Sequence, residues 1–316
     1  MTKLITGGTG YIGAELAHLL VSRGEKVVLF DVAINRARIA DIESKVKVVR
    51  GDLGVYSEVL NVVNDNRITE IYHLGSLLTG VSEDNPWGSF QANVVGTYNV
   101  LEAARVLGVK QVMFTSTLGT YGIGFGEVID DNTLQRPITM YGCGKLYGEG
   151  LGRFYHKKFG LDFRSVRFAY MVGWNVRTPN HWAPPMIEDA IMGRPHRCIY
   201  ATPETAQSFI HVKDAALACA RVLEAPVERI ETMNYNVTGV PRHVSAAEMA
   251  AILKKRYRGF EVTFDKDVLP GVLEQNRMYG KVTRFDDSRA RAEWGWQPRY
   301  GTPEAIIEAM DKDRPA

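Results

Sequence analysis

Tyr141 and Lys145 have the residue types and the spacing needed to move a proton. They are four residues apart, so they lie on one face of any helix that covers this segment. A free phenol has a pKa of about 10 and is a poor base at neutral pH. A nearby ammonium group favours the phenolate, so this pair can exchange a proton with the alcohol group of a substrate.

A hydroxyl-rich segment lies about 24 residues before Tyr141. It includes Ser116, Thr117 and Thr120 and comes at the end of a predicted strand. A hydroxyl at this place can hold a substrate oxygen beside the Tyr141 phenol. Thr117 and Ser116 are the two candidates for that role.

Glycines recur at positions 7, 10 and 13, between an apolar run and the start of a helical pattern. In such a turn Gly7 permits a tight bend, Gly10 lets the backbone approach a pyrophosphate, and Gly13 lets the helix pack against the strand. The first helical residues, Tyr11 and Ile12, bring free N–H groups to the anion. The segment therefore predicts a dinucleotide site.

Asp31 ends the second apolar run, 18 residues beyond Gly13. A carboxylate at this place accepts hydrogen bonds from the adenosine ribose and repels the 2′-phosphate of NADP. The sequence therefore predicts NAD as the cofactor. Arg36 and Arg38 follow closely and keep NADP open as the alternative.

Two further predicted strands end in residues suited to the same ligand. Asp52 and Leu53 follow the third strand, and Leu74, Gly75 and Ser76 follow the fourth. Because ligands of parallel sheets bind at the carboxyl ends of the strands, we expect these residues to contact the cofactor.

The elements that must position these residues follow from the apolar pattern. Strand-like runs occupy residues 3–6, 26–30, 46–49, 71–74 and 111–116, and helical stretches, notably 90–107, separate them. Strands that alternate with helices predict an α/β fold with a doubly wound parallel sheet, the Rossmann fold.

The amino-acid composition of the chain changes after about residue 167, where prolines become frequent. We expect residues 1–168 to form the NAD-binding Rossmann domain and residues 205–235 to return to it. Residues 169–204 and 236–316 are predicted to form a smaller, loop-rich substrate-binding cap.

Composition excludes several other classes of protein. The 316 residues are 45% hydrophobic and carry a formal net charge of +2, with no basic tract and no apolar run long enough to cross a bilayer. We therefore expect neither nucleic acid nor a membrane as a partner. The three cysteines lack metal-ligand spacing, so we expect no metal site and a location in the reducing cytoplasm.

Together the glycine turn, the hydroxyl-rich strand end and the Tyr141–Lys145 pair resemble the extended short-chain dehydrogenases, the NAD-dependent epimerase/dehydratase type, over about residues 1–240. The resemblance implies that Thr117 polarises the substrate and that Tyr141 is the acid/base. It implies that Lys145 lowers the pKa of Tyr141 and bonds the nicotinamide ribose. It also makes Asn93 the residue that orders the active-site end of its helix and a contact of the cofactor, and it makes a homodimer the expected assembly.

The chain departs from the nucleotide-sugar branch of that family at two places. Tyr170 and Met171 stand where an asparagine-proline pair is expected, and Gln207 stands where an arginine would hold a diphosphate. The segments 77–80, 83–86 and 200–205 instead resemble the L-threonine dehydrogenases of the same fold, although Gln207 again replaces an arginine.

These resemblances imply an NAD-dependent oxidoreductase that oxidises a secondary alcohol of a small polar substrate, either a hydroxy acid or a sugar acid. The alternative is a nucleotide-sugar epimerase or dehydratase with tightly bound NAD. A cofactor-binding regulatory protein is a third hypothesis, which the intact Thr117, Tyr141 and Lys145 oppose. Thr79, Tyr170 and Trp182 are the further candidates for substrate contacts, with helix capping for Thr79 and cap packing for Trp182 as the structural alternatives.

Overall fold

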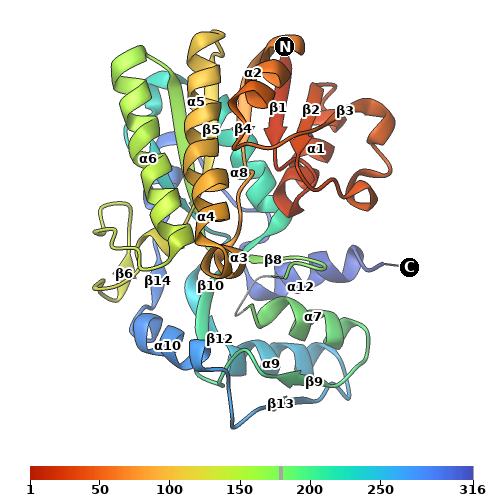
Figure 1. Ribbon diagram of the computed structural model, residues 1–316. Helices are drawn as coiled ribbons and strands as arrows, with labels where there is room; N and C mark the ends of the chain where they lie inside the picture. The colour runs from red at the N-terminus through yellow and green to blue at the C-terminus, as the bar shows by residue number, and fades with distance from the viewer. Residues whose placement is uncertain (178–180, 316) are drawn as a thin grey trace.

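The computed structural model describes residues 1–177 and 181–315 and contains a seven-stranded parallel sheet with a smaller part beyond the carboxyl ends of its strands (Figure 1). The order of the large sheet is β11-β7-β5-β4-β1-β2-β3. Its strands are β1 (Thr2–Thr6), β2 (Lys26–Asp31), β3 (Val46–Arg50), β4 (Ile68–His73), β5 (Gln111–Thr117), β7 (Asp162–Phe168) and β11 (Asn234–Val237). The order reverses between β1 and β4, which is the place where doubly wound sheets bind ligands.

Both faces of this sheet are buried. Leu4 and Ile5 are adjacent in β1, are fully buried, and belong to different hydrophobic clusters on opposite faces. Because side chains alternate along a strand, an uninterrupted apolar run requires helices on both sides. The helices around the sheet are α1 (Tyr11–Ser22), α2 (Tyr56–Asp65), α3 (Thr79–Asp84), α4 (Pro86–Ser89), α5 (Gly96–Val106), α6 (Met140–Phe159) and α8 (Val212–Glu224). Helices α2, α5 and α6 cover one face, and α1 packs against α8 on the other.

The predicted helix at residues 90–107 is interrupted in its hydrogen-bond pattern. Residues Phe90–Val95 form a π-helical segment between α4 and α5. Such wide turns are rare and occur often at functional sites. Asn93 lies in this segment, and its contacts are described below.

A second sheet organises the smaller part. Its order is β6-β14-β12-β10-β8, and a separate two-stranded sheet pairs β13 with β9. These strands are β6 (Val128–Ile129), β8 (Tyr170–Val172), β9 (His196–Cys198), β10 (Ala206–His211), β12 (Val240–Ser245), β13 (Val262–Phe264) and β14 (Arg284–Phe285). The remaining α-helices are α7 (Ala183–Ile191), α9 (Ala246–Arg256), α10 (Pro270–Tyr279), α11 (Ser288–Trp294) and α12 (Pro303–Lys312).

The chain exchanges segments between the two sheets more often than the sequence suggested. We expected residues 205–235 to rejoin the large sheet, but β10 pairs with β8 and β12 in the second sheet, and only α8 and β11 return. Strand β6 lies within residues 1–168 yet pairs with β14. Short strands of this kind carry too few residues for a pattern to assign their partner. Among the described residues, no helix is both long and apolar enough to cross a membrane.

Candidate active site

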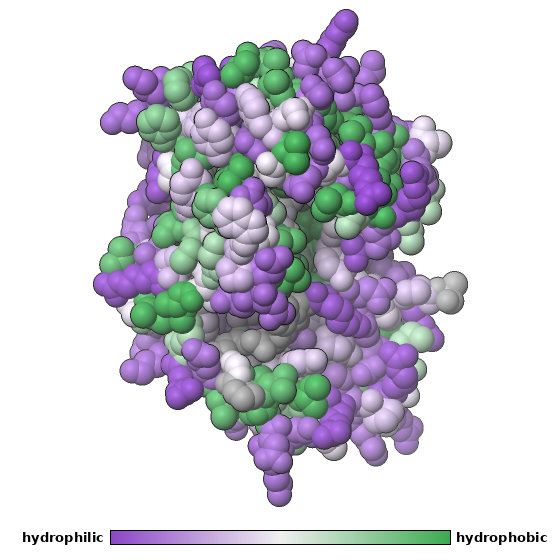
Figure 2. Space-filling model, viewed as in Figure 1, coloured by the Kyte–Doolittle hydropathy of each residue, from purple (hydrophilic) through white to green (hydrophobic). Residues whose placement is uncertain are grey.

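A cavity of about 830 Å³ lies at the carboxyl ends of the central strands of the large sheet, between these strand ends and the smaller part. The face shown in Figure 2 is hollowed between these two parts, and apolar side chains are visible in the hollow. The cavity is larger than a single small substrate requires. It therefore has room for a cofactor and a substrate together.

The glycine turn forms one end of the cavity, where Gly7, Gly10, Tyr11, Ile12 and Gly13 line it. Gly7 has a φ of +63°, and a Cβ there would lie 2.8 Å from the backbone of Gly75. A Cβ at Gly13 would lie 2.2 Å from the Gly7 carbonyl oxygen. Side chains at these two places would fill the cradle, so the turn fits a pyrophosphate held by backbone at the start of α1.

Asp31 lies at the end of β2 and lines the same end of the cavity. Its Oδ2 accepts hydrogen bonds from the backbone N–H and the hydroxyl of Thr9, at 3.0 and 2.8 Å, and Oδ1 accepts from the Ala33 N–H. Carboxylate oxygens have lone pairs beyond these, so ribose hydroxyls can still bind.

Arg36 and Arg38, which left NADP as the alternative cofactor, both have partners within the protein. Arg36 forms an ion pair with Glu43. The Arg38 guanidinium lies 4.0 Å from the centre of the Tyr11 ring and donates to the Thr9 carbonyl oxygen. Arg38 also lines the cavity, so it remains the one candidate for contact with a 2′-phosphate among the described lining residues.

The predicted residues at the next strand ends reach the cavity as well. Asp52, Leu53, Leu74, Gly75 and Ser76 all line it. Thr6 and His73 hold this edge together, because the Thr6 hydroxyl bonds His73 Nδ1 at 2.8 Å and accepts from the Gly75 N–H at 3.1 Å. The carboxyl ends of β3 and β4 therefore lie where the sequence placed them.

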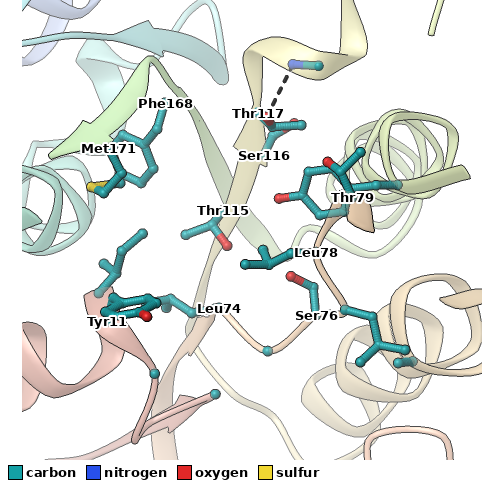
Figure 3. Close-up of a pocket in the computed structure, with 18 of the residues that line it drawn as sticks. Tyr11, Leu74, Ser76, Leu78, Thr79, Thr115, Ser116, Thr117, Phe168 and Met171 are labelled. Atoms are coloured by element: carbon teal, nitrogen blue, oxygen red, sulfur yellow. Dashed lines mark hydrogen bonds between the residues drawn. The ribbon is translucent and has the colours of Figure 1, made fainter. Parts of the chain in front are cut away.

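Tyr141 lies near the start of α6, whose first turn is capped by the Thr139 hydroxyl. The hydroxyls of Ser76, in the loop after β4, and of Thr117, at the end of β5, lie near its phenol and favour the phenolate. Figure 3 shows Ser76 and Thr117 in the cavity, the first on the loop that follows β4 and the second at the end of β5. Residues from three segments of the chain therefore line the cavity around the phenol, and a substrate oxygen at this place would lie near the hydroxyls of Ser76 and Thr117.

Lys145 lies one helical turn after Tyr141 and is buried. Its Nζ donates to the Thr115 carbonyl oxygen at 2.8 Å and lies 5.6 Å from the centre of the Tyr141 ring. Burial lowers the pKa of Lys145 to about 7, against the opposing charge of Glu149. Lys145 is absent from the described lining of the cavity, so it stands behind the phenol.

The pKa of Tyr141 moves in the opposite direction to the one expected. We predicted that Lys145 lowers it, but burial raises the pKa of Tyr141 to about 12, and only the hydrogen bonds to Ser76 and Thr117 act against this. The physical reason is desolvation, which penalises the phenolate more than these hydrogen bonds stabilise it.

Ser116 and Thr117 are adjacent but have different partners. Thr117 Oγ1 accepts from the Gly119 N–H at 3.1 Å, and the residue lines the cavity beside Tyr141. The Ser116 hydroxyl instead donates to Glu149 Oε1 at 2.5 Å. Glu149 is fully buried on α6 and is paired with Arg167 Nη2 at 2.7 Å. This buried pair was not predicted, although Glu149 follows Lys145 by one helical turn.

Asn93 contacts a loop and does not line the cavity. Its Oδ1 accepts from the Leu77 N–H at 2.8 Å, and its Nδ2 donates to the Leu77 carbonyl oxygen and to the Ser89 hydroxyl. The amide therefore fixes the segment after Ser76. We expected Asn93 to contact the cofactor directly, but this geometry does not support such a contact.

The candidates for substrate contacts divide into two groups. Thr79 and Tyr170 line the cavity, and so does His181. Trp182 does not, because it is fully buried in the core of the smaller part, with its ring centre 5.5 Å from that of Phe209. The proline-flanked tryptophan is a packing residue, and its assignment to the substrate is corrected.

Several lining residues were not predicted. Among them are Glu83, Ile138, Thr139, Met171, Gly271, Glu274, Met278 and Tyr279. The last four lie on α10, far along the chain from the motifs. No local pattern marks α10 as a wall of the cavity, because only the folded chain brings it there.

Comparison with known proteins agrees with this geometry. The pattern of the NAD dependent epimerase/dehydratase family matches residues 3–238. The chain is 29% identical to the mitochondrial L-threonine 3-dehydrogenase of Sus scrofa over 98% of its own length and 81% of that protein. This similarity extends through both parts of the molecule.

Solved structures show the same relationship. The L-threonine dehydrogenase of Cupriavidus necator in its holo form superposes with a TM-score of 0.86 at 28% identity, covering 98% of this chain and 99% of that one. The UDP-glucose 4-epimerase of Thermus thermophilus in complex with NAD gives 0.78 at 25% identity, covering 98% of each chain. The chain therefore belongs to the NAD-dependent epimerase/dehydratase family and is an NAD-dependent enzyme of the extended short-chain dehydrogenase type.

Proposed function

We propose that the protein is a dehydrogenase that oxidises a secondary alcohol of a small polar substrate and passes the electrons to NAD. The observation that carries this proposal is the convergence of Ser76, Thr117 and Tyr141 on one point of the cavity. The resemblance to threonine dehydrogenases places hydroxy acids and sugar acids, threonine among them, first in a substrate panel.

In this proposal Thr117 holds the alcohol oxygen and Tyr141 takes its proton. NAD, when bound, accepts the hydride from the carbinol carbon, so that the alcohol becomes a ketone. The Gly7 turn and Asp31 would hold the pyrophosphate and the adenosine ribose. Lys145 lies 5.6 Å from the centre of the Tyr141 ring, and in the cofactor-free protein its charge does not offset the effect of burial on the phenol.

The charges of the cavity favour a dehydrogenase over the alternative, a nucleotide-sugar epimerase or dehydratase. A sugar nucleotide carries a diphosphate, which arginine binds best through paired hydrogen bonds. Among the described lining residues the one lysine or arginine is Arg38, which contacts Tyr11 at the glycine turn. The cofactor's own pyrophosphate occupies that end in the proposed complex, so a second diphosphate would lack a cation.

Addition of a substrate panel to the protein with excess free NAD tests the function. A dehydrogenase accumulates NADH with turnover, whereas an epimerase with tightly held NAD returns its hydride and shows no net reduction. Conversion of a nucleotide sugar without accumulation of NADH would overturn the proposal.

We further propose a homodimer in the reducing cytoplasm. Aromatic side chains are exposed on α5 and α6, with Tyr98 44%, Tyr147 43% and Phe154 54% accessible. Exposed apolar patches of this kind mark interfaces. Cys143, Cys198 and Cys219 are all free thiols, as expected in a reducing compartment.

A further inference from the structure

The smaller part of the molecule forms one wall of the cavity, and this wall carries no positive charge among the described residues. The residues that it contributes are Ala169, Tyr170, Met171, Val176, His181, Gly271, Glu274, Met278 and Tyr279. Burial lowers the pKa of His181 to about 4, so its imidazole is neutral at pH 7. Among the described residues of this wall, Glu274 is then the one that carries a formal charge.

The facing wall near Tyr141 has the same sign. Glu83, on α3, lines the cavity there, and its Oε1 accepts from the Met140 N–H at 2.8 Å. Lys145 stands behind the phenol, with its Nζ bonded to the Thr115 carbonyl oxygen. Arg38 contacts Tyr11 at the opposite, nucleotide end. The substrate end of the described cavity is therefore lined by acidic and neutral groups.

This charge distribution selects against an anionic substrate. Removing a carboxylate or phosphate from water without a cationic partner costs several kcal/mol. The carboxylates of Glu83 and Glu274 would add repulsion, whereas an ammonium group would be attracted to them. His181 Nδ1 is buried and has no hydrogen-bond partner among the described residues. A neutral imidazole can bond an uncharged polar group or an amine but cannot neutralise an acid.

We propose that the substrate of this site is a small secondary alcohol that carries an amine and lacks a carboxylate or phosphate. This inference rests on the proposed dehydrogenase function, and it departs from the hydroxy acids and sugar acids that the resemblance to threonine dehydrogenases puts first. The carbinol C–H bond would break as the hydride passes to NAD, and the hydroxyl proton would pass to Tyr141. The products are an amino ketone, NADH and one proton.

Four related alcohols test the inference, because they differ only in the two charged groups. Threonine has both groups, 1-amino-2-propanol lacks the carboxylate, 3-hydroxybutyrate lacks the amine, and 2-propanol lacks both. We expect kcat/KM to be at least about tenfold higher for 1-amino-2-propanol than for threonine, and 3-hydroxybutyrate to be the poorest of the four. A higher kcat/KM for either acid than for its carboxylate-free counterpart would overturn the inference.

Calorimetric binding of the same compounds to the protein–NADH complex gives a ranking that does not depend on turnover. 1-Amino-2-propanol should bind at least about tenfold more tightly than threonine, as expected for kcat/KM. If it does so but no alcohol reduces NAD, the dehydrogenase function fails while the substrate class stands. If the amine does not bind measurably, or threonine binds more tightly, the substrate class fails even where NADH is formed.

Variants of Glu274 test the wall itself. Because Glu274 is exposed, Glu274→Gln should lower the preference for the amine over threonine by about two- to fivefold, the usual size of an exposed ion pair. Glu274→Lys should lower it further and raise activity on 3-hydroxybutyrate. Asp267→Asn removes an exposed carboxylate outside the cavity lining and is the matched control, which should leave the ranking unchanged. Equal effects of Glu274→Gln and Asp267→Asn would contradict a local contact.

Discussion

The hydroxyl of Ser116 donates a hydrogen bond of 2.5 Å to Oε1 of Glu149, a carboxylate whose two oxygens also accept hydrogen bonds from Arg167. Its neighbour Thr117 lines the cavity near the Tyr141 phenol. The sequence left both hydroxyls as candidates for polarising the substrate. The geometry favours Thr117, because the proton of Ser116 is already committed to a buried carboxylate.

Replacement of the two hydroxyls should therefore separate catalysis from stability. Thr117→Ala should lower turnover by about 10- to 100-fold, the range of a hydrogen bond to a charged group, with little change in the thermal midpoint. Ser116→Ala leaves Glu149 with one partner fewer and should cost about 1–3 kcal/mol of unfolding free energy. Steady-state kinetics and calorimetric melting check the pair. Loss of turnover only in Ser116→Ala would exchange the two roles.

Proton transfer depends on the phenol oxygen of Tyr141. Tyr141→Phe keeps the ring and removes that oxygen, so turnover should fall by about 100- to 10,000-fold while NAD affinity stays the same. Kinetics with a verified substrate and calorimetric titration of NAD measure the two effects. Near-normal turnover in this variant would mean that another group is the base.

The pH dependence follows from the direction of the Tyr141 shift. Burial raises its pKa to about 12 in the cofactor-free protein, so the fold favours the neutral phenol and the base form grows only as pH rises. Oxidation of the alcohol should therefore speed up with increasing pH, and Tyr141→Phe should abolish this rise. Spectrophotometric titration of the phenolate with and without NAD checks the origin, because the positive charge of bound NAD should lower the pKa. A rate that falls as pH rises would contradict Tyr141 as the base.

Cofactor preference should follow from Asp31. NAD should bind at least tenfold more tightly than NADP, a difference of about 1.4 kcal/mol, because the carboxylate repels the 2′-phosphate. Asp31→Ala should reduce this difference in affinity between NAD and NADP. Calorimetric titration with both nucleotides measures it directly. Equal affinity in the unchanged protein would show that Arg38 dominates at this end of the cavity.

The exposed aromatic side chains on α5 and α6 predict the assembly. Light scattering should give twice the chain mass of 35.3 kDa at micromolar concentration. Phe154→Glu places a charge on this face and should shift the mass toward the monomer. Leu134→Glu, at a side chain 60% exposed in a loop, is the control and should leave the mass unchanged. A monomer mass for the unchanged protein would refute the dimer.

The sequence predicted those parts of the fold that a local pattern determines. Strands β1 to β5 and the glycine turn were located closely, because apolar runs and a glycine turn between a strand and a helix are signals contained in a few residues. Trp182 and α10 show the opposite case. Whether a proline-flanked tryptophan packs in a core or lines a cavity depends on residues far away in the chain, such as Phe209.

The charge states of the site could not be predicted from the sequence for the same reason, because they depend on burial in the folded chain. The spacing of Tyr141 and Lys145 gave their shared helix face but not their burial, and burial sets the direction of both pKa shifts. The buried pair of Glu149 and Arg167 joins α6 to β7, a contact that spacing within one element cannot reveal.

The repeated passage of the chain between the two sheets has a consequence for how the molecule moves and unfolds. Along the chain, β6 belongs to the second sheet and the next strand, β7, belongs to the first. In the same way β10 belongs to the second sheet and β11 to the first. No single cut in the described chain separates the sheets with all their strands intact. The halves should therefore melt as one cooperative unit, and any opening of the cleft must bend several connections together, which makes it a small shear and not a wide swing about one hinge.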